Sequence, residues 1–449
     1  MMVMKHTYTL LLLLASLFLT ACDDFLDIQP TGKVIAKTCE EYRALLTDVY
    51  NNFPDDRSLT TLRTDEMTLD PATTTSEDLN SYFDIWRWQD VAQDENTVAF
   101  NWRRFYHTIY IANYVIEHQE EITEGTKADI DQLVGEAYML RAYSHFVLVN
   151  LFGQPYTKCD PASTLAVPLW VKADVELVLA RSSVGDIYTQ ILNDIASAKT
   201  YLNQEEWEPQ LTYRFNTLSA EALLARACLY MGDWQGALNA AKTVVEAHPA
   251  LEDLTSSSYT MPDHYTSAEA IVCLEQVMKS AYKGIGAPST AFINTYRTGD
   301  MRKSRYFKAQ TSRLYTLLKG GDPLCRSTFR SAELYLTAAE AAARLDDKET
   351  AISYMRPIIE TRYMPALQPS ILSEMEQKDS SELIEAILEE RAHELCFEGH
   401  RWFDLRRTTQ PEITKTYDGT TYTLEENDSR YTIPIPTEAI NGNPSLGEE

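Results

Sequence analysis

Apolar and polar positions alternate with helical spacing through much of the chain. The clearest example is residues 216–247, a stretch without proline in which apolar residues recur every three or four positions on either side of a break at Gly232-Asp233. The recurring residues are Ala222, Leu223, Ala227 and Tyr230 before the break, and Ala237, Leu238, Ala241, Val244 and Val245 after it. Pro249 ends the second half. We therefore expect two closely packed helices joined by a tight turn, as in a tetratricopeptide repeat.

A second copy of this pattern lies further along the chain. Ala351-Ile352 and Ile358-Ile359 repeat the apolar register, and the break falls at Asp346-Asp347. Pro357 lies inside the predicted second helix and should kink or shorten it. Weaker helical patterns over residues 98–118, 130–151 and 184–202 bring the total to about four helical pairs. The sequence thus predicts a mainly α fold of tetratricopeptide-like helical hairpins, with an irregular helical bundle as the alternative.

The predicted helices form a frame over about residues 94–250 and 329–407, and four long stretches lack helical spacing. These stretches cover about residues 51–93, 156–181, 249–328 and 408–449, and each combines turn-forming residues with aromatic residues. Connections beyond about 15 residues are uncommon unless they bind something or are disordered, and aromatic residues make disorder less probable. We expect residues 22–449 to form one domain in which these insertions contact a ligand.

The N-terminus has the order of features that protein export requires. Lys5 and His6 precede an apolar run over residues 10–19, which is too short to span a membrane, and the run ends in Leu19-Thr20-Ala21-Cys22. We predict that residues 1–21 are a lipoprotein signal peptide and that Cys22 carries the lipid. The alternative is a buried cysteine after a core helix.

Charge and motif content argue against several classes of function. The chain has 66 acidic and 40 basic side chains, and its net charge of −26 would repel nucleic acid. The cysteines show no metal-ligand spacing, and Cys228 and Cys396 fit helical apolar patterns, where cysteine usually packs as a small hydrophobe. The sequence contains no nucleophile elbow, phosphate-binding glycine loop or H-E-x-x-H motif. We expect no metal, no cofactor and no enzymatic activity, although a triad of distant residues stays possible.

Aromatic residues in the insertions are the best candidates for ligand contacts. Sugar rings present flat apolar faces on which exposed Trp or Tyr can stack, while nearby polar groups bond the hydroxyls. The run over residues 82–89 has this mixture, and an extended backbone would place Trp86 and Trp88 on one side. The alternative is that both are core residues. The predicted ligand contacts here are Tyr82, Trp86, Arg87 and Trp88, with Tyr296 and Tyr315 as weaker candidates.

One segment has a charge opposite to that of the whole chain. Residues 281–330 contain ten basic residues and only Asp300 and Asp322 as acidic ones, a local charge of +8. Two interpretations stay open. The segment packs against acidic helices of the same chain, or Arg297, Arg302 and Arg305 bind a carboxylated or sulfated ligand.

Residues 390–407 contain closely spaced charges of both signs. Glu390 and Glu394 are one helical turn apart, Gly399 can end a helix in the left-handed conformation, and Arg401 lies three residues before Asp404. We interpret this motif as a structural cluster of ion pairs between helices. The alternative, in which Glu394 and Glu398 are paired glycosidase carboxylates, is disfavoured because nearby arginines oppose the raised pKa of an acid catalyst.

Several motifs together resemble the SusD/RagB family of surface lipoproteins. They are residues 22–27 with Pro30, Asn113 and residues 152–155 in the early helices, residues 330–341, residues 390–407, residues 434–436 and Asn443-Pro444. The resemblance implies a tetratricopeptide-containing right-handed superhelix, anchored in the outer membrane by lipid at the cell surface. It also implies capture of an oligosaccharide or polysaccharide, or in some members a peptide, for a SusC-like TonB-dependent transporter. A helical scaffold of the cell envelope is a further alternative.

Overall fold

The computed structural model describes residues 36–310 and 314–447. The predicted signal peptide and Cys22 lie outside the described residues. Within these two ranges, every helix is either too short or too polar to cross a membrane.

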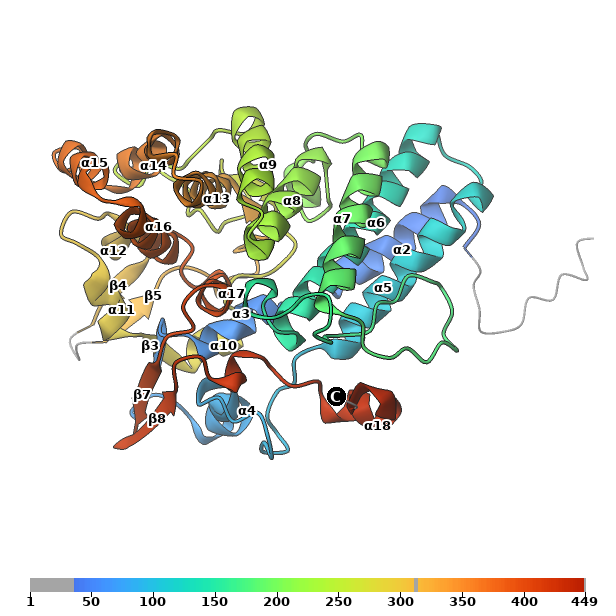
Figure 1. Cartoon of the computed structure of the whole chain (residues 1–449), viewed down its shortest axis with the longest axis horizontal. Helices are drawn as coiled ribbons and strands as arrows, with labels where there is room; N and C mark the ends of the chain where they lie inside the picture. Colours follow the sequence, from blue (N-terminus) through green and yellow to red (C-terminus); the bar gives the residue numbers. More distant parts are fainter. Residues whose placement is uncertain (1–35, 311–313, 448–449) are drawn as a thin grey trace, which may run out of the picture.

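A stack of antiparallel helices forms most of the molecule (Figure 1). The helices are α2 (Cys39–Asn51), α5 (Trp102–Glu117), α6 (Lys127–Phe152), α7 (Val184–Tyr201), α8 (Thr217–Met231), α9 (Trp234–Ala247), α13 (Ser331–Arg344), α14 (Lys348–Arg362), α15 (Gln368–Gln377) and α16 (Ser380–Glu394). From α5 to α9 each helix packs on the next, α13 packs on α9, α14 and α16, and α14 packs on α15. The prediction of a mainly helical, tetratricopeptide-like fold is confirmed.

The predicted breaks between paired helices are confirmed. Gly232 ends α8 in the left-handed conformation with φ +78°, and the Asp233 side chain accepts a hydrogen bond from the backbone of Gly236 to begin α9. Asp346 takes φ +60° between α13 and α14, where Asp347 caps the next helix. The predicted shortening at Pro357 is wrong, because α14 continues past it to Arg362. Buried apolar residues on both sides of Pro357 hold the helix in place.

The helical stack continues across the long insertion between α9 and α13. At the point where the insertion leaves and returns, His248 and Ser331 contact each other: the Ser331 hydroxyl lies 3.0 Å from the His248 carbonyl oxygen and 2.8 Å from His248 Nδ1. The two ends of residues 249–330 are therefore joined, and α13 takes the position beside α9 that the next repeat would occupy.

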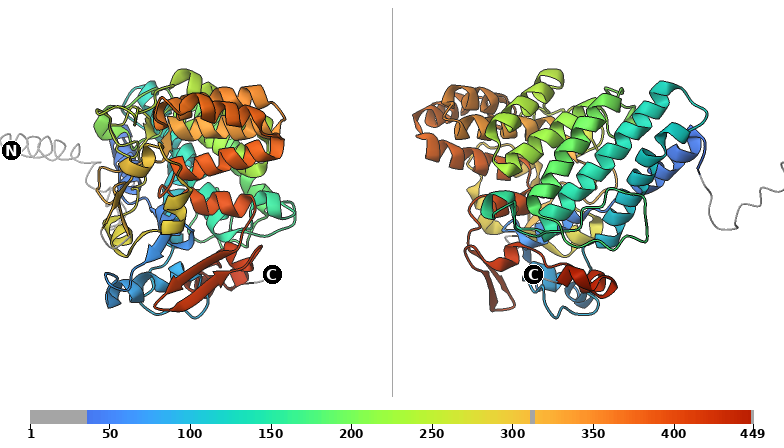
Figure 2. Two further views of the ribbon diagram at one scale, coloured as in Figure 1. Left: turned by 90° about the vertical axis from the view of Figure 1, so that its left-hand side faces the viewer. Right: turned by 45° about the vertical axis from the view of Figure 1, so that its right-hand side comes forward.

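Within the described ranges, the insertions contain short helices and four two-stranded antiparallel sheets. The strand pair nearest the C-terminus, drawn in red, lies below the helical stack in Figure 2. The strands pair as β1 (Met67–Leu69) with β3 (Gly286–Pro288), β2 (Ala270–Val272) with β6 (Phe329–Arg330), β4 (Phe307–Ala309) with β5 (Tyr315–Leu317), and β7 (Ile413–Tyr417) with β8 (Thr420–Leu424). The short helices of the insertions are α3 (Asp56–Leu59), α4 (Ser76–Trp86), α10 (Ser280–Gly284), α11 (Thr290–Thr295), α12 (Arg302–Arg305) and α18 (Thr437–Gly442). Another short helix, α17 (Arg401–Arg407), follows α16.

The run over residues 82–89 is not extended, because most of it lies in α4. Thr75 and Asp78 form a capping box at the start of α4, in which each side chain bonds the backbone N–H of the other. This signal was present in the sequence. In this helical conformation Trp86 and Trp88 do not project to the same side, as they would from a strand.

The charged motif over residues 390–407 is a buried cluster of ion pairs, as interpreted from the sequence. Glu394 on α16 contacts Arg330 and Arg362, each at 2.8 Å, and Arg302 at 3.3 Å. Glu398 contacts Arg330 at 2.8 Å and also Lys319. The arginines hold the pKa of Glu394 well below its usual value against the effect of burial, so this carboxylate stays ionised and is unsuited to acid catalysis.

Other residues of the motif over residues 390–407 contact the insertion of residues 51–93. Arg401 pairs with Asp65 at 2.7 Å, while Asp404 pairs with Arg391 at 2.8 Å. Gly399 takes φ +73°, and a Cβ there would lie 2.6 Å from the carbonyl group of Arg57, so the close approach of this turn to α3 requires glycine. The motif therefore joins the helical stack to two insertions, residues 51–93 through Asp65 and residues 249–328 through Arg302 and Lys319.

Candidate functional site

Two of the predicted ligand residues are in the core. Trp86 and Trp88 are 0% and 1% exposed. The indole N–H of Trp86 donates to the carbonyl of Met67 at 3.3 Å, and that of Trp88 donates to the carbonyl of Arg63 at 2.9 Å. The Lys415 ammonium lies 4.4 Å from the centre of the Trp88 ring. The core alternative is therefore the right one for this pair, because ring faces covered by protein cannot stack on a ligand.

Two further candidates are also buried. Tyr296 donates its hydroxyl to the carbonyl of His393 at 3.0 Å, and its ring stacks on the His393 ring. Arg302 is fully buried and pairs with Asp300 at 2.7 Å, Glu390 at 2.5 Å and Glu394. An acidic ligand cannot reach Arg302. Its burial among carboxylates supports the interpretation that the basic segment packs against acidic helices of the same chain.

The remaining candidates reach solvent but belong to separate elements. Tyr82 and Arg87 are half-buried at α4, where Arg87 pairs with Asp84 at 2.6 Å. Tyr315 is half-buried on β5. Arg297 is exposed and pairs with Glu374 at 2.9 Å, and Arg305 donates to the carbonyl groups of Leu254 and Ser256. The structure does not bring these side chains into one site.

Four other aromatic side chains form a continuous wall. Trp102, Tyr106 and Tyr110 are spaced four residues apart on α5, so they share one face of that helix. Trp170 comes from the loop between α6 and α7. Ring centroids are 4.9 Å apart between Trp102 and Tyr106, 6.2 Å between Tyr106 and Trp170, and 5.9 Å between Tyr110 and Trp170. The wall borders a cavity of about 500 Å³.

Buried hydrogen bonds position the loop that carries Trp170. The Tyr106 hydroxyl donates to the carbonyl of Pro168 at 2.9 Å. The side-chain amide of Asn113 donates to the carbonyl groups of Trp170 and Lys172 at 3.2 and 3.1 Å, and its oxygen accepts from Arg141. Because these partners lie on α5 and α6, the helical stack fixes the position of the fourth ring.

The C-terminal segment closes the other side of the cavity. Asn443 donates to the carbonyl of Leu179 at 2.8 Å, which ties this segment to the same loop. A second cavity of about 580 Å³ lies between the start of α5 and α18, and it shares Trp102, Arg103 and Ala439 with the first. The two cavities therefore form one groove beside α18, which we call the aromatic groove.

Polar groups accompany the rings of the aromatic groove. Arg103 and Glu438 lie on opposite sides, 3.5 Å apart, and both side chains are exposed. His107 is exposed on the ring-bearing face of α5. This combination offers apolar faces together with charged donors and acceptors, which suits a ligand that has both a flat apolar face and hydroxyl groups.

The sequence contained a signal for this groove. Trp102, Tyr106 and Tyr110 show the four-residue spacing of one helical face, in a stretch that was already predicted to be helical. Trp170 lies in an insertion that was expected to contact a ligand. The sequence does not show that the loop between α6 and α7 places Trp170 against this face of α5, and only the fold shows it.

The described part of the chain contains no cluster of metal-ligand side chains and no disulfide. Across residues 36–310 and 314–447, no three His, Cys, Asp or Glu side chains are grouped so that they could hold a metal ion. The six cysteines in these ranges are free thiols, and Cys228 and Cys396 are buried in the core as predicted.

Comparison with known proteins identifies related sequences along most of the chain. Residues 24–229 match a SusD-like family described as "Starch-binding associating with outer membrane", and residues 325–448 match the SusD family. The SusD-like protein P38 of Formosa agariphila is 23% identical, in an alignment that covers 90% of this chain and 91% of the relative.

Solved structures share the fold. A SusD superfamily protein of Bacteroides thetaiotaomicron has a TM-score of 0.75 at 21% identity and covers 91% of this chain and 99% of its own. A laminarin binding SusD-like protein has a TM-score of 0.60 at 19% identity, with coverage of 83% and 92%. The two family matches, the relative and the shared fold agree, and the chain belongs to the SusD/RagB family.

Proposed function

We propose that this protein is a cell-surface lipoprotein of the outer membrane that binds an oligosaccharide or polysaccharide in the aromatic groove and delivers it to a SusC-like TonB-dependent transporter. The observation that carries the proposal is the wall of four aromatic rings, Trp102, Tyr106, Tyr110 and Trp170. We propose binding without chemical change of the ligand.

The size and composition of the groove fit a glycan. Trp102, Tyr110 and Trp170 are half-buried and can each contact a sugar face, while the buried Tyr106 packs against Trp102 and Trp170. Cavities of about 500 and 580 Å³ hold a short oligosaccharide. Arg103, His107 and Glu438 can bond hydroxyl groups at the edges. Laminarin, a glucan, is the ligand named for one structural neighbour, which makes neutral glucans the first ligands to test.

Ring removal tests the proposal. Trp170→Ala and Tyr110→Ala should each weaken glycan binding by roughly tenfold, because an aromatic residue at the centre of an interface commonly contributes about 1 to 2 kcal/mol. Isothermal titration calorimetry with laminarin and starch oligosaccharides measures the effect.

Two further variants complete this experiment. Trp234→Ala is a matched control, since Trp234 is a half-buried tryptophan on α9 that lies under Arg344 and away from the groove. Tyr82→Ala tests the half-buried candidate predicted from the sequence. Wild-type affinity in both groove variants, or a loss of affinity only in Tyr82→Ala, would contradict the assignment of the groove.

A peptide is the second candidate ligand. Val175 and Leu177 line the aromatic groove, and Val175 is 69% exposed, so apolar peptide side chains could also pack there. Titration with a peptide pool beside the glycan pool separates the two ligand classes. Binding of peptides alone would replace the glycan proposal.

A further inference from the structure

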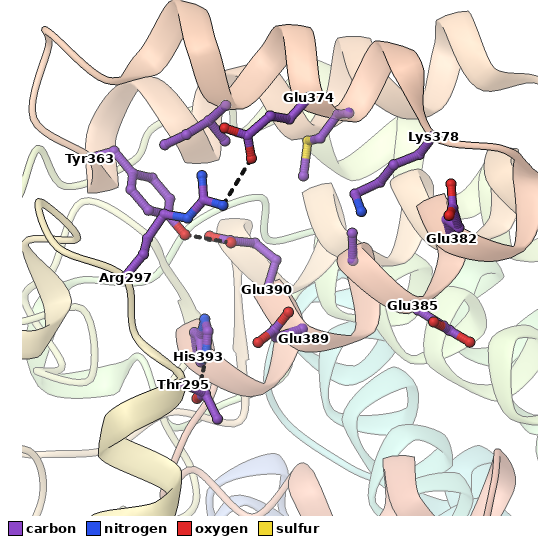
Figure 3. A pocket seen from close by; sticks show the side chains of 13 residues that line it. Thr295, Arg297, Tyr363, Glu374, Lys378, Glu382, Glu385, Glu389, Glu390 and His393 are labelled. Carbon is purple, nitrogen blue, oxygen red and sulfur yellow. Dashed lines mark hydrogen bonds and ion pairs between the residues drawn. The ribbon is translucent and has the colours of Figure 1, made fainter.

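A third cavity, separate from the aromatic groove, is seen from close by in Figure 3. The helices that border it, α15 and α16, lie at the opposite end of the helical stack from α5 and α18 (Figure 1). This cavity has a volume of about 480 Å³ and lies between α15, α16 and the chain that follows α11. Four carboxylates and one histidine of α16 face it: Glu382, Glu385, Glu389, Glu390 and His393. We call this cavity the acidic cleft.

The floor of the acidic cleft contains a buried hydrogen-bond acceptor without a partner. His393 is 4% exposed, and its Nδ1 atom has no hydrogen-bond partner in the described structure. Its other ring nitrogen, Nε2, lies 2.7 Å from the hydroxyl of Thr295. Figure 3 shows the ring with its second nitrogen directed into the cleft.

The neighbours of His393 decide which nitrogen carries the proton. The Thr295 hydroxyl lies 2.7 Å from the carbonyl oxygen of Phe292, which can only accept, so the hydroxyl donates its proton there. Thr295 then accepts from Nε2–H of His393. Burial and surrounding arginines lower the pKa of His393 well below its usual value, so the ring is neutral and Nδ1 is a bare acceptor. A hydrogen-bond donor in the cleft would therefore satisfy Nδ1 of His393.

The charges around this acceptor favour a cation. Five carboxylates and two basic side chains, Arg297 and Lys378, line the cleft, and Arg297 is already paired with Glu374. Glu385 and Glu389 are exposed and have no ion-pair partner among the described residues. Because Glu385, Glu389 and His393 are successive i, i+4 neighbours on α16, they form one stripe along the cleft.

We propose that the acidic cleft binds a small ligand through a primary ammonium group, which donates one hydrogen bond to Nδ1 of His393 and lies against the carboxylates of Glu389 and Glu385. An ammonium group has three donors and no acceptor, and this matches a site that offers only acceptors on this stripe. The volume of the cleft leaves room for a body of one or two sugar rings or an amino acid. This site is independent of the aromatic groove.

Titration of the purified full chain with matched amines tests the proposal. The probes are glucosamine and cadaverine, and N-acetylglucosamine is the neutral control for the amino sugar. Both amines should bind at low ionic strength, while the acetylated sugar should not. Binding of glucosamine alone would assign the site to amino sugars, whereas failure of both amines up to 50 mM (about 50-fold above a 1 mM dissociation constant) would overturn the proposal.

A charge-matched pair of variants separates the site from general electrostatic attraction. Glu385→Gln with Glu389→Gln should weaken amine binding roughly fivefold. Glu349→Gln with Glu376→Gln removes the same charge from exposed positions outside the cleft and should leave binding within about twofold of wild type. Equal losses in the two double variants would contradict the assigned site.

A spectroscopic readout tests the role of His393 without changing it. The ¹⁵N chemical shift of its Nδ1 atom should move on addition of amine, since the atom gains a hydrogen-bond donor. An unchanged shift at saturating amine would exclude His393 from the site. Loss of glycan binding in the aromatic groove would leave each of these results unaffected.

Discussion

Glu66 is a fully buried carboxyl group beside β1. Burial, with a smaller contribution from the charge of Asp65, raises its pKa to about 8 from a usual 4.5. One carboxyl oxygen accepts a hydrogen bond from the backbone N–H of Phe397 at 3.0 Å, and the other lies 3.2 Å from the hydroxyl of Thr64. That hydroxyl donates to the carbonyl of Thr61, so it can accept a hydrogen bond from the protonated carboxyl group of Glu66. The local geometry therefore suits the protonated form.

This raised pKa predicts a pH dependence of stability. Between about pH 4.5 and 8 the folded state holds a proton on Glu66 that the unfolded state has lost, so the free energy of unfolding falls as pH rises through this range. Glu66→Gln keeps the acceptor and the donor without the charge, and it should raise the free energy of unfolding at pH 8.5 by about 4 to 5 kcal/mol, with little change at pH 4.5. Urea denaturation at the two pH values measures this, and equal effects at both would contradict the assignment.

At the scale of elements, α16 presents two faces with different energetic roles. Its inner face places Glu394 among Arg302, Arg330 and Arg362, and its outer face carries the exposed Glu385. Glu394→Gln should lower the free energy of unfolding by about 3 to 5 kcal/mol, because it leaves buried arginines without their counter-charge. Glu385→Gln should change it by less than about 0.5 kcal/mol. Similar urea midpoints for the two variants would show that the buried cluster contributes little.

The elements also show what the sequence could and could not predict. Helical periodicity and the breaks between paired helices were sufficient for α8, α9, α13 and α14, although α8 and α13 are buried on nearly all sides and not along one stripe. These patterns were insufficient for α4, where the core partner of Trp86 is Lys415 on β7, more than 300 residues away. The local sequence around Trp86 and Trp88 does not indicate whether a distant strand covers their rings. Their burial could therefore be established only from the fold.

At the scale of the molecule, the predicted attachment to the membrane depends on a single residue outside the described ranges. Cys22→Ser should prevent lipid attachment and move the protein from the membrane fraction to the soluble fraction, while glycan binding stays as in wild type. Immunoblots of fractionated cells measure the distribution. Retention of the variant in the membrane fraction would show that another part of the chain, or a partner, holds it there.

The joined ends of residues 249–330 have a consequence for replacing this segment by another. Because the chain leaves and re-enters beside His248 and Ser331, this segment can be exchanged without moving α9 relative to α13. It also supplies Arg302, Lys319 and Arg330, which neutralise Glu394 and Glu398. A transplanted segment must therefore bring equivalent cations, because otherwise the buried carboxylates of Glu394 and Glu398 lose their counter-charges.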